Sequence, residues 1–134
     1  MSILKIKKAA ERYLSTMPSQ WSTAYEGVSF NPPDGNYLRT QLSIQEPEDP
    51  TFGTGYHRER VQFQVFVVAL SGRGTGEALT KAEEIRQRFA KGTFLLEDSV
   101  RIHVLETPRV GSAASVEGRL IVPVLIDLVC EIES

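Results

Sequence analysis

Residues 57–70 read HRERVQFQVFVVAL, and this stretch decides the fold. In its first half Val61, Phe63 and Val65 alternate with glutamines, and a period of two is typical of a half-buried β-strand. Its second half, residues 65–70, is apolar on both faces, so we expect a cover on both sides, one of them a helix. The sequence therefore predicts a long strand with more apolar surface than two helices alone can cover.

An amphipathic helix is predicted on each side of this strand along the chain. Residues 2–17 place apolar side chains at helical spacing, and Pro18 stops the helix just after the stripe ends. The stripe consists of Ile3, Ile6, Ala10, Tyr13, Leu14 and Met17. A second helix is expected over residues 76–90, with Thr75 as its N-cap. Its inward stripe and flank are expected to contain Leu79, Ala82, Ile85, Arg86 and Phe89.

The remaining segments either alternate like strands or contain turn residues. Period-two patterns predict strands at residues 22–25, 37–45, 93–96, 100–107 and 118–132. Residues 46–56 and 107–115 are predicted loops, because they are rich in Pro, Gly, Ser and acidic residues. Connections of hairpin length favour antiparallel pairing. We therefore predict one α+β domain over residues 1–134, with a mostly antiparallel β-sheet and two helices packed on one face.

The composition is that of a globular protein, with 41% hydrophobic and 24% charged residues. A net charge of −2 offers no excess of cations with which to grip DNA phosphates. No run of about 18 apolar residues is present, so no membrane-spanning helix is expected. The N-terminal segment lacks the pattern of a signal peptide and Cys130 is the single cysteine, so synthesis in a reducing cytoplasm is expected.

Residues with catalytic or metal-binding potential are sparse. His57 and His103 are the two histidines and lie far apart in the sequence, so the fold would have to assemble any metal site around them. Cys130 falls on the apolar face of the last predicted strand, where it is expected to pack as a small hydrophobic residue. We therefore expect no enzymatic activity, no metal and no cofactor.

A glycine turn favours a different class of function. Gly72, Gly74 and Gly76 lie between a predicted strand and a predicted helix, where backbone N–H groups favour anions. However, their spacing differs from the dinucleotide-binding pattern, and no Gly-Lys-Ser/Thr sequence follows. A small nucleotide-binding module that uses the turn 72–76 is therefore the rival interpretation, and a flexible connection is the favoured one.

The long loop and the basic segment that follows it form a candidate contact surface. The sequence RER at 58–60 either guards a strand edge against unwanted pairing or forms ion pairs with a neighbouring subunit. Phe52 and Tyr56 give the loop 46–56 two aromatic side chains, and interfaces concentrate aromatic residues and arginine at their centres. We therefore interpret the loop and its basic flank as a surface that contacts a neighbour.

Short motifs in a fixed order resemble those of a family of small phage tail proteins. They are AYEGVSF at 24–30, PPDG at 32–35, YLR at 37–39, GTGYHRER at 53–60, FQV at 63–65, a strand-glycine-helix unit at 74–89, TPRVG at 107–111 and VPV at 122–124. Together they cover nearly the whole chain, and their succession is similar to that of the tail terminators, or tail-completion proteins, of long-tailed siphophage-type bacteriophages.

This resemblance implies a structural α+β subunit of the virion tail, made in the host bacterial cytoplasm. Such subunits form a homo-hexameric ring that caps the tail tube, stops its polymerisation and offers a surface to the head-completion protein. Genomic DNA would pass through the lumen without specific binding. Another head–tail connector or a tube subunit is the alternative within the same assembly. The candidate residues for contact with a neighbouring subunit or the tube are Phe52, Tyr56, Arg58, Glu59, Arg60, Arg39 and Arg109.

Overall fold

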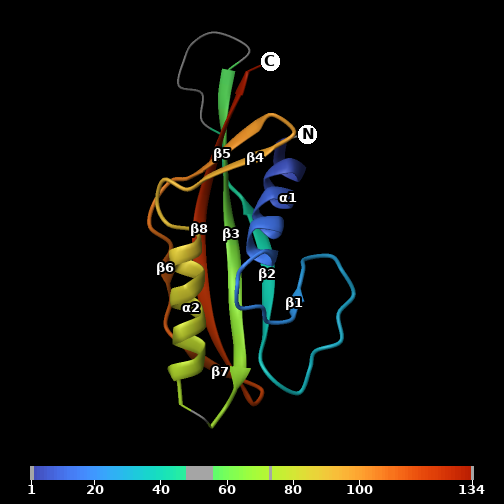
Figure 1. The fold of residues 1–134 in the computed structure, drawn as a ribbon, viewed down its shortest axis with the longest axis vertical. Coiled ribbons are helices and arrows are strands. Elements are labelled where there is room, and N and C mark those ends of the chain that lie inside the picture. The colour runs from blue at the N-terminus through green and yellow to red at the C-terminus, as the bar shows by residue number, and fades with distance from the viewer. Residues whose placement is uncertain (1, 48–55, 73, 134) are drawn as a thin grey trace.

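The computed structural model describes residues 2–47, 56–72 and 74–133, which form two helices and a curled, mostly antiparallel sheet (Figure 1). The elements in chain order are α1 Ser2–Ser15, β1 Thr23–Ala24, β2 Tyr37–Ile44, β3 Tyr56–Leu70, α2 Gly76–Arg88, β4 Phe94–Glu97, β5 Val100–Val104, β6 Arg109–Val110, β7 Ala114–Val116 and β8 Arg119–Glu133. The predicted α+β class is confirmed.

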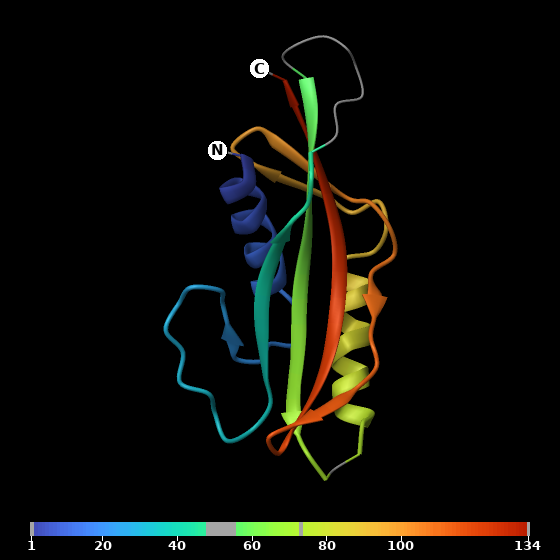
Figure 2. The ribbon, with the colours of Figure 1, turned by 180° about the vertical axis from the view of Figure 1, so that it is seen from behind.

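The antiparallel pair of β3 and β8 forms the centre of the sheet. Both strands are 15 residues long, and they pair along their full length, from Tyr56 opposite Glu133 to Leu70 opposite Arg119. β2 pairs with the other edge of β3, and β1 adds to β2 in parallel. The other edge of β8 is covered in succession by β7, β6 and β5 (Figure 2). The short strands are thus placed by the long pair.

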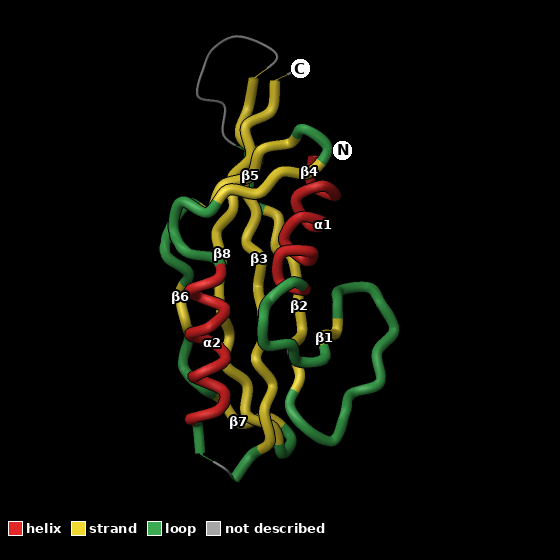
Figure 3. Tube along the Cα trace, viewed as in Figure 1, coloured by secondary structure: helices red, strands yellow, loops and turns green. Residues whose placement is uncertain are grey.

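Both helices pack on the same face of this sheet, and the two layers enclose the core (Figure 3). α1 contacts β3 and the hairpin of β4 and β5, whereas α2 contacts β8, β3 and β6. Alternate residues of β3 point into this core, as their period-two pattern predicts. The buried side chains of the core include Ile6, Ala10, Leu14, Phe63, Val65, Ala82, Ile85, Phe89, Val122, Val124 and Ile126.

Two arginines connect α1 to β4 and to α2. Arg12 of α1 forms an ion pair of 2.6 Å with the buried Glu97 of β4. Arg88 of α2 donates to the backbone carbonyl of Tyr13 at 3.2 Å, and its guanidinium stacks 3.9 Å from the centre of the Tyr13 ring. Charge-assisted hydrogen bonds of this kind hold a definite geometry. α1 is therefore docked by polar contacts as well as by its apolar stripe.

The inward stripe of α2 differs from the predicted one at Leu79. Leu79 is 44% exposed, whereas Ala78 and Lys81 are 1% exposed. Lys81 can be buried because its ammonium donates to the backbone carbonyl of Ser19 at 2.6 Å. The predicted burial of Ala82, Ile85 and Phe89 is confirmed, whereas that of Leu79 was wrong, because Lys81 is buried on this face through a partner that is distant in the chain.

Residues 107–115 were predicted as a loop, but they contain β6 and the start of β7, which pair with β8. Gly111 lies between them and donates its N–H to the carbonyl of Pro123 at 2.9 Å. A side chain at Gly111 would begin 2.7 Å from the Pro123 ring, so this close approach requires glycine. The segment therefore forms two short edge strands on β8, and Gly111 continues the pairing of β6 by one residue.

The docking of α1 predicts a difference between two leucines of the same helix. Leu14→Ala should lower the free energy of unfolding by about 2–5 kcal/mol, because it leaves a cavity at a side chain that is 2% exposed. Leu4→Ala should change it by about 0.5 kcal/mol or less, because Leu4 is 48% exposed. Urea unfolding of both variants measures these changes. Equal effects would show that α1 is not docked as described.

Candidate functional site

The candidate site is the face of the sheet that lies opposite the two helices. Among the described residues no helix covers this face, as the view from behind shows (Figure 2). Its members alternate with the core residues along β2, β3 and β8, because successive side chains of a strand point to opposite faces. We call it the helix-free face.

One half of the helix-free face is apolar. In the register of the sheet, Phe66 lies beside Pro123 and Val68 beside Ile121, and Tyr37 of β2 lies on the other side of Val68. Val68, between these neighbours, is 2% exposed. Leu70 and Leu125 extend this group, which we call the apolar patch. Apart from Val68, its side chains are only half-buried: Tyr37, Phe66, Leu70, Ile121, Pro123 and Leu125. A helix was expected to cover one side of residues 65–70 and another element the second side. The helix-free face is the side that no described helix covers.

Aromatic and cationic groups surround this apolar patch. The Phe30 ring lies 5.4 Å from that of Tyr37. The guanidinium of Arg39 lies 4.6 Å from the centre of the Phe66 ring, and Arg39 is exposed. Arg119 is held in place because it donates to the carbonyl of Pro33 at 2.9 Å. Such stacked arginines are common where proteins bind other proteins.

A band of polar side chains crosses the middle of the face. Gln64 donates to Gln62 at 2.8 Å, and Gln62 donates to Asp127 at 3.2 Å. Arg109 of β6 lies 3.8 Å from the same carboxylate of Asp127. The band is therefore internally hydrogen-bonded, and it separates the apolar patch from the charged end of the sheet.

The charged end contains two of the predicted interface arginines. Arg58 and Arg60 lie on the helix-free face, and Arg58 forms an ion pair of 3.2 Å with Glu131 of β8. Glu59 lies on the opposite face, where it is 2.9 Å from His57. Two roles were proposed for the segment 58–60, protection of a strand edge and ion pairing with a neighbouring subunit. The structure adds a third, because Arg58 forms an ion pair within the chain.

The other predicted residues fall in different places. Arg39 and Arg109 lie on the helix-free face, close to the apolar patch and to the polar band respectively. Tyr56 begins β3 opposite Glu133. Phe52 lies outside the described residues, as does most of the loop 46–56. Sequence reasoning missed Tyr37, Phe66 and Pro123 as a surface patch, although the two-sided apolar pattern of residues 65–70 was its signal.

Comparison with known proteins identifies the family to which this chain belongs. Residues 5–127 match the model of a family described as phage tail terminator protein. The chain belongs to the phage tail terminator family. This is a family of structural virion proteins and not of enzymes, so this tail terminator has a structural role in the phage tail, together with other tail or head proteins.

Two solved structures share the fold of this tail terminator. One is a protein without a functional name, with 20% identity, coverage of 96% of this chain and 92% of that chain, and a TM-score of 0.72. The other belongs to the virion of a native gene transfer agent (GTA) particle, with 15% identity, coverage of 99% and 98%, and a TM-score of 0.68. None of the curated proteins is significantly similar in sequence.

The last glycine of the turn, Gly76, borders a pocket that two carboxylates line. Gly72 and Gly74 adopt positive φ angles of 85° and 77°, and Gly76 lines the pocket together with Glu77 and Glu84. These two carboxylates would repel a phosphate group. Thus the local charge disfavours the nucleotide-binding interpretation.

The described residues were also searched for metal-binding, membrane-spanning and nucleophilic groups. They contain no group of three His, Cys, Asp or Glu side chains that could hold a metal ion. Neither described helix has the length and apolar character that crossing a membrane requires. Burial raises the pKa of the Cys130 thiol to about 11, and the negative charges of Glu59 and Glu131 add to this effect. Because the thiolate is the reactive form, Cys130 is a poor nucleophile at neutral pH.

The raised pKa predicts slow thiol chemistry. At pH 8, Cys130 of the folded protein should react with a disulfide reagent at least about a hundredfold more slowly than in urea, where the thiol is hydrated and titrates near its ordinary pKa. Absorbance of the released thiolate measures both rates, and Cys130→Ser supplies the blank. Similar rates in the folded and unfolded protein would contradict the burial of this thiol.

Proposed function

We propose that this tail terminator forms a homo-hexameric ring that caps the tail tube, stops tube polymerisation and provides the surface that joins the head. The observation that carries the proposal is the apolar half of the helix-free face. Apolar sheet faces are normally covered by a second layer. Contiguous exposed apolar patches mark contacts with other proteins.

The composition of the helix-free face supports a contact between subunits. Its aromatic and apolar centre around Phe66 is bordered by the polar band of Gln62, Gln64 and Asp127. An apolar centre with a polar rim is the usual anatomy of a protein interface. Because a ring needs one surface of each subunit to meet a different surface of the next, this face would contact another part of the neighbouring copy.

The charge of the chain suits a ring that encloses DNA. The net charge is −2, so six copies together carry no excess of cations. Genomic DNA would therefore pass without specific binding. The charged end of the sheet, with Arg58 and Arg60, is the surface that we assign to the tube or to a neighbour, and the head-completion protein would bind the other side of the ring.

Another head–tail connector or a tube subunit is the alternative. A tube subunit would add along the whole length of the tube, whereas a terminator binds only its end. Labelled protein mixed with purified tail tubes separates these functions by electron microscopy. Label at one end of each tube supports the terminator, and label along the tube contradicts it.

A substitution on the apolar patch tests the ring. Leu125→Glu should prevent a hexamer from forming at tube ends, because a carboxylate would be buried in an apolar contact. Leu96→Glu on β4, whose side chain is 58% exposed and whose strand pairs with β5 away from the patch, is the matched control and should assemble like the wild type. Native mass spectrometry in the presence of tubes measures the stoichiometry, and thermal melting checks the fold. A Leu125→Glu protein that forms normal hexamers would contradict the proposed interface.

A further inference from the structure

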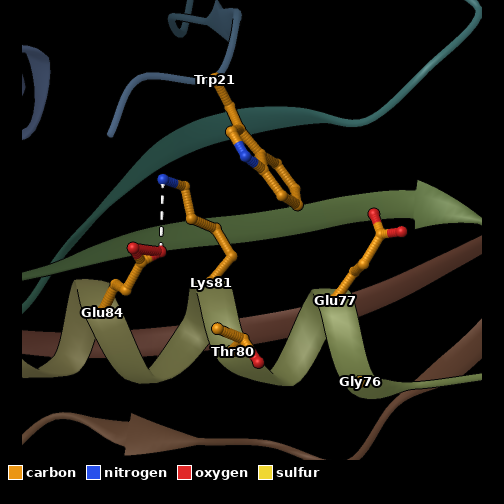
Figure 4. A pocket seen from close by; sticks show the side chains of 6 residues that line it. All are labelled: Trp21, Gly76, Glu77, Thr80, Lys81 and Glu84. Carbon is orange, nitrogen blue, oxygen red and sulfur yellow. Dashed lines mark ion pairs between the residues drawn. The ribbon is translucent and has the colours of Figure 1, made fainter. Parts of the chain in front are cut away.

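The helical side of the molecule holds a pocket with an aromatic wall and two carboxylates (Figure 4). It has a volume of about 440 Å³ and lies between Trp21 and the first two turns of α2. Trp21 extends toward the helix between Lys81 and Glu77, while Glu84 lies one turn further along α2. The Trp21 side chain is half-buried and Glu77 is exposed.

The charge of this pocket is negative. Lys81 is the cation among its lining residues, and its ammonium is already bound by the carbonyl of Ser19 at 2.6 Å and by Glu84 at 3.6 Å. Glu77 accepts one hydrogen bond, from Asn36 at 2.6 Å, which leaves a carboxylate further lone pairs for a second donor. An indole beside carboxylates is the environment that a planar guanidinium fits, because arginine both stacks on rings and pairs with carboxylates.

The guanidinium of Arg39 lies on the opposite side of the same molecule. Arg39 is exposed on the helix-free face and stacks on Phe66. Among the residues that the structure describes, it forms no ion pair. Its ring contact holds the side chain against the sheet, so less conformational entropy is lost when it binds.

The pocket and Arg39 lie at the same level of the sheet. Arg39 of β2 is in register with Ala24 of β1, and the neighbouring Leu38 donates its N–H to the carbonyl of Ser22. Trp21 directly precedes Ser22 and packs against the core on the helical side. If a second copy lies on the helical side of the first, shifted along the direction perpendicular to the sheet, its Arg39 would therefore come close to the Trp21 pocket of the first copy.

We propose that neighbouring copies of this chain stack face to back, with Arg39 of one copy seated against Trp21 and Glu77 of the next. This contact rests on the proposed ring. It gives the apolar patch of each sheet a cover formed by the helical side of the neighbour. The contact is heterologous, and such contacts produce closed rings when the rotation between copies closes.

A charge swap tests this contact. Arg39→Glu alone and Glu77→Arg alone should each weaken assembly on tube ends by about tenfold or more, because each places like charges together at the centre of a contact. The double variant with both changes in one chain restores opposite charges at every contact of the ring and should recover assembly. Arg101→Glu on the exposed side of the β4–β5 hairpin is the matched control, because it makes the same charge change elsewhere.

Native mass spectrometry with tail tubes measures assembly, and thermal melting verifies that each variant is folded. Arg39→Gln, which keeps a long polar side chain, replaces Arg39→Glu if the latter melts early. Loss in both single variants and recovery in the double variant supports the contact. If Arg39→Glu forms rings as abundantly as Arg101→Glu, the proposed contact is overturned. If the double variant fails to recover assembly, the contact is also overturned. In both cases the proposed function still stands. Absence of rings for the wild type would overturn the proposed function itself.

Discussion

The antiparallel pairing of β3 with β8 is the constraint on which the rest of the structure depends. Two strands of 15 residues form one continuous ladder. Each of the other strands joins this ladder or is carried by a strand that does. Because side chains alternate across a strand, the ladder also fixes two long faces at once. One face takes the core under α1 and α2, and the same register fixes the helix-free face.

The asymmetry between the two faces connects the fold with a structural role. The helical face buries its apolar residues within the subunit, whereas the opposite face leaves Phe66, Ile121 and Leu125 only half-buried. The described residues combine this surface with an inert thiol at Cys130 and no metal cluster. A member of the phage tail terminator family needs contact surfaces rather than catalytic groups, and the architecture supplies one broad surface of this kind.

Much of the fold follows from periodicity, which the sequence carries locally. Strong period-two patterns predicted β3 and β8, and the helical stripe predicted α1 with its end near Pro18. The prediction placed Ala82, Ile85 and Phe89 correctly on the buried face of α2. The burial of Lys81 could not be predicted, because it depends on the bond between Lys81 and Ser19, which are distant in the chain. β6 and β7 were missed for a similar reason: they are two and three residues long, and the edge of β8 defines them.

The candidate site was predictable only in outline. An apolar pattern on both faces of residues 65–70 indicated that a second cover was needed, but it could not say which neighbours complete the patch. The stack of Arg39 on Phe66 and the ion pair of Arg58 with Glu131 both depend on strand register. Register is a tertiary property, set by pairing between segments that are far apart in the sequence.

Side-chain oxidation of the helix-free face tests the central claim most directly. Hydroxyl-radical footprinting of free subunits and of subunits on complete tails compares the solvent access of Tyr37 and Phe66, with Phe94 of β4, 48% exposed in the subunit, as an internal reference. If a neighbouring copy covers the apolar patch, oxidation of Tyr37 and Phe66 should fall severalfold on assembly. Equal oxidation of these two side chains in free subunits and in tails would contradict the account.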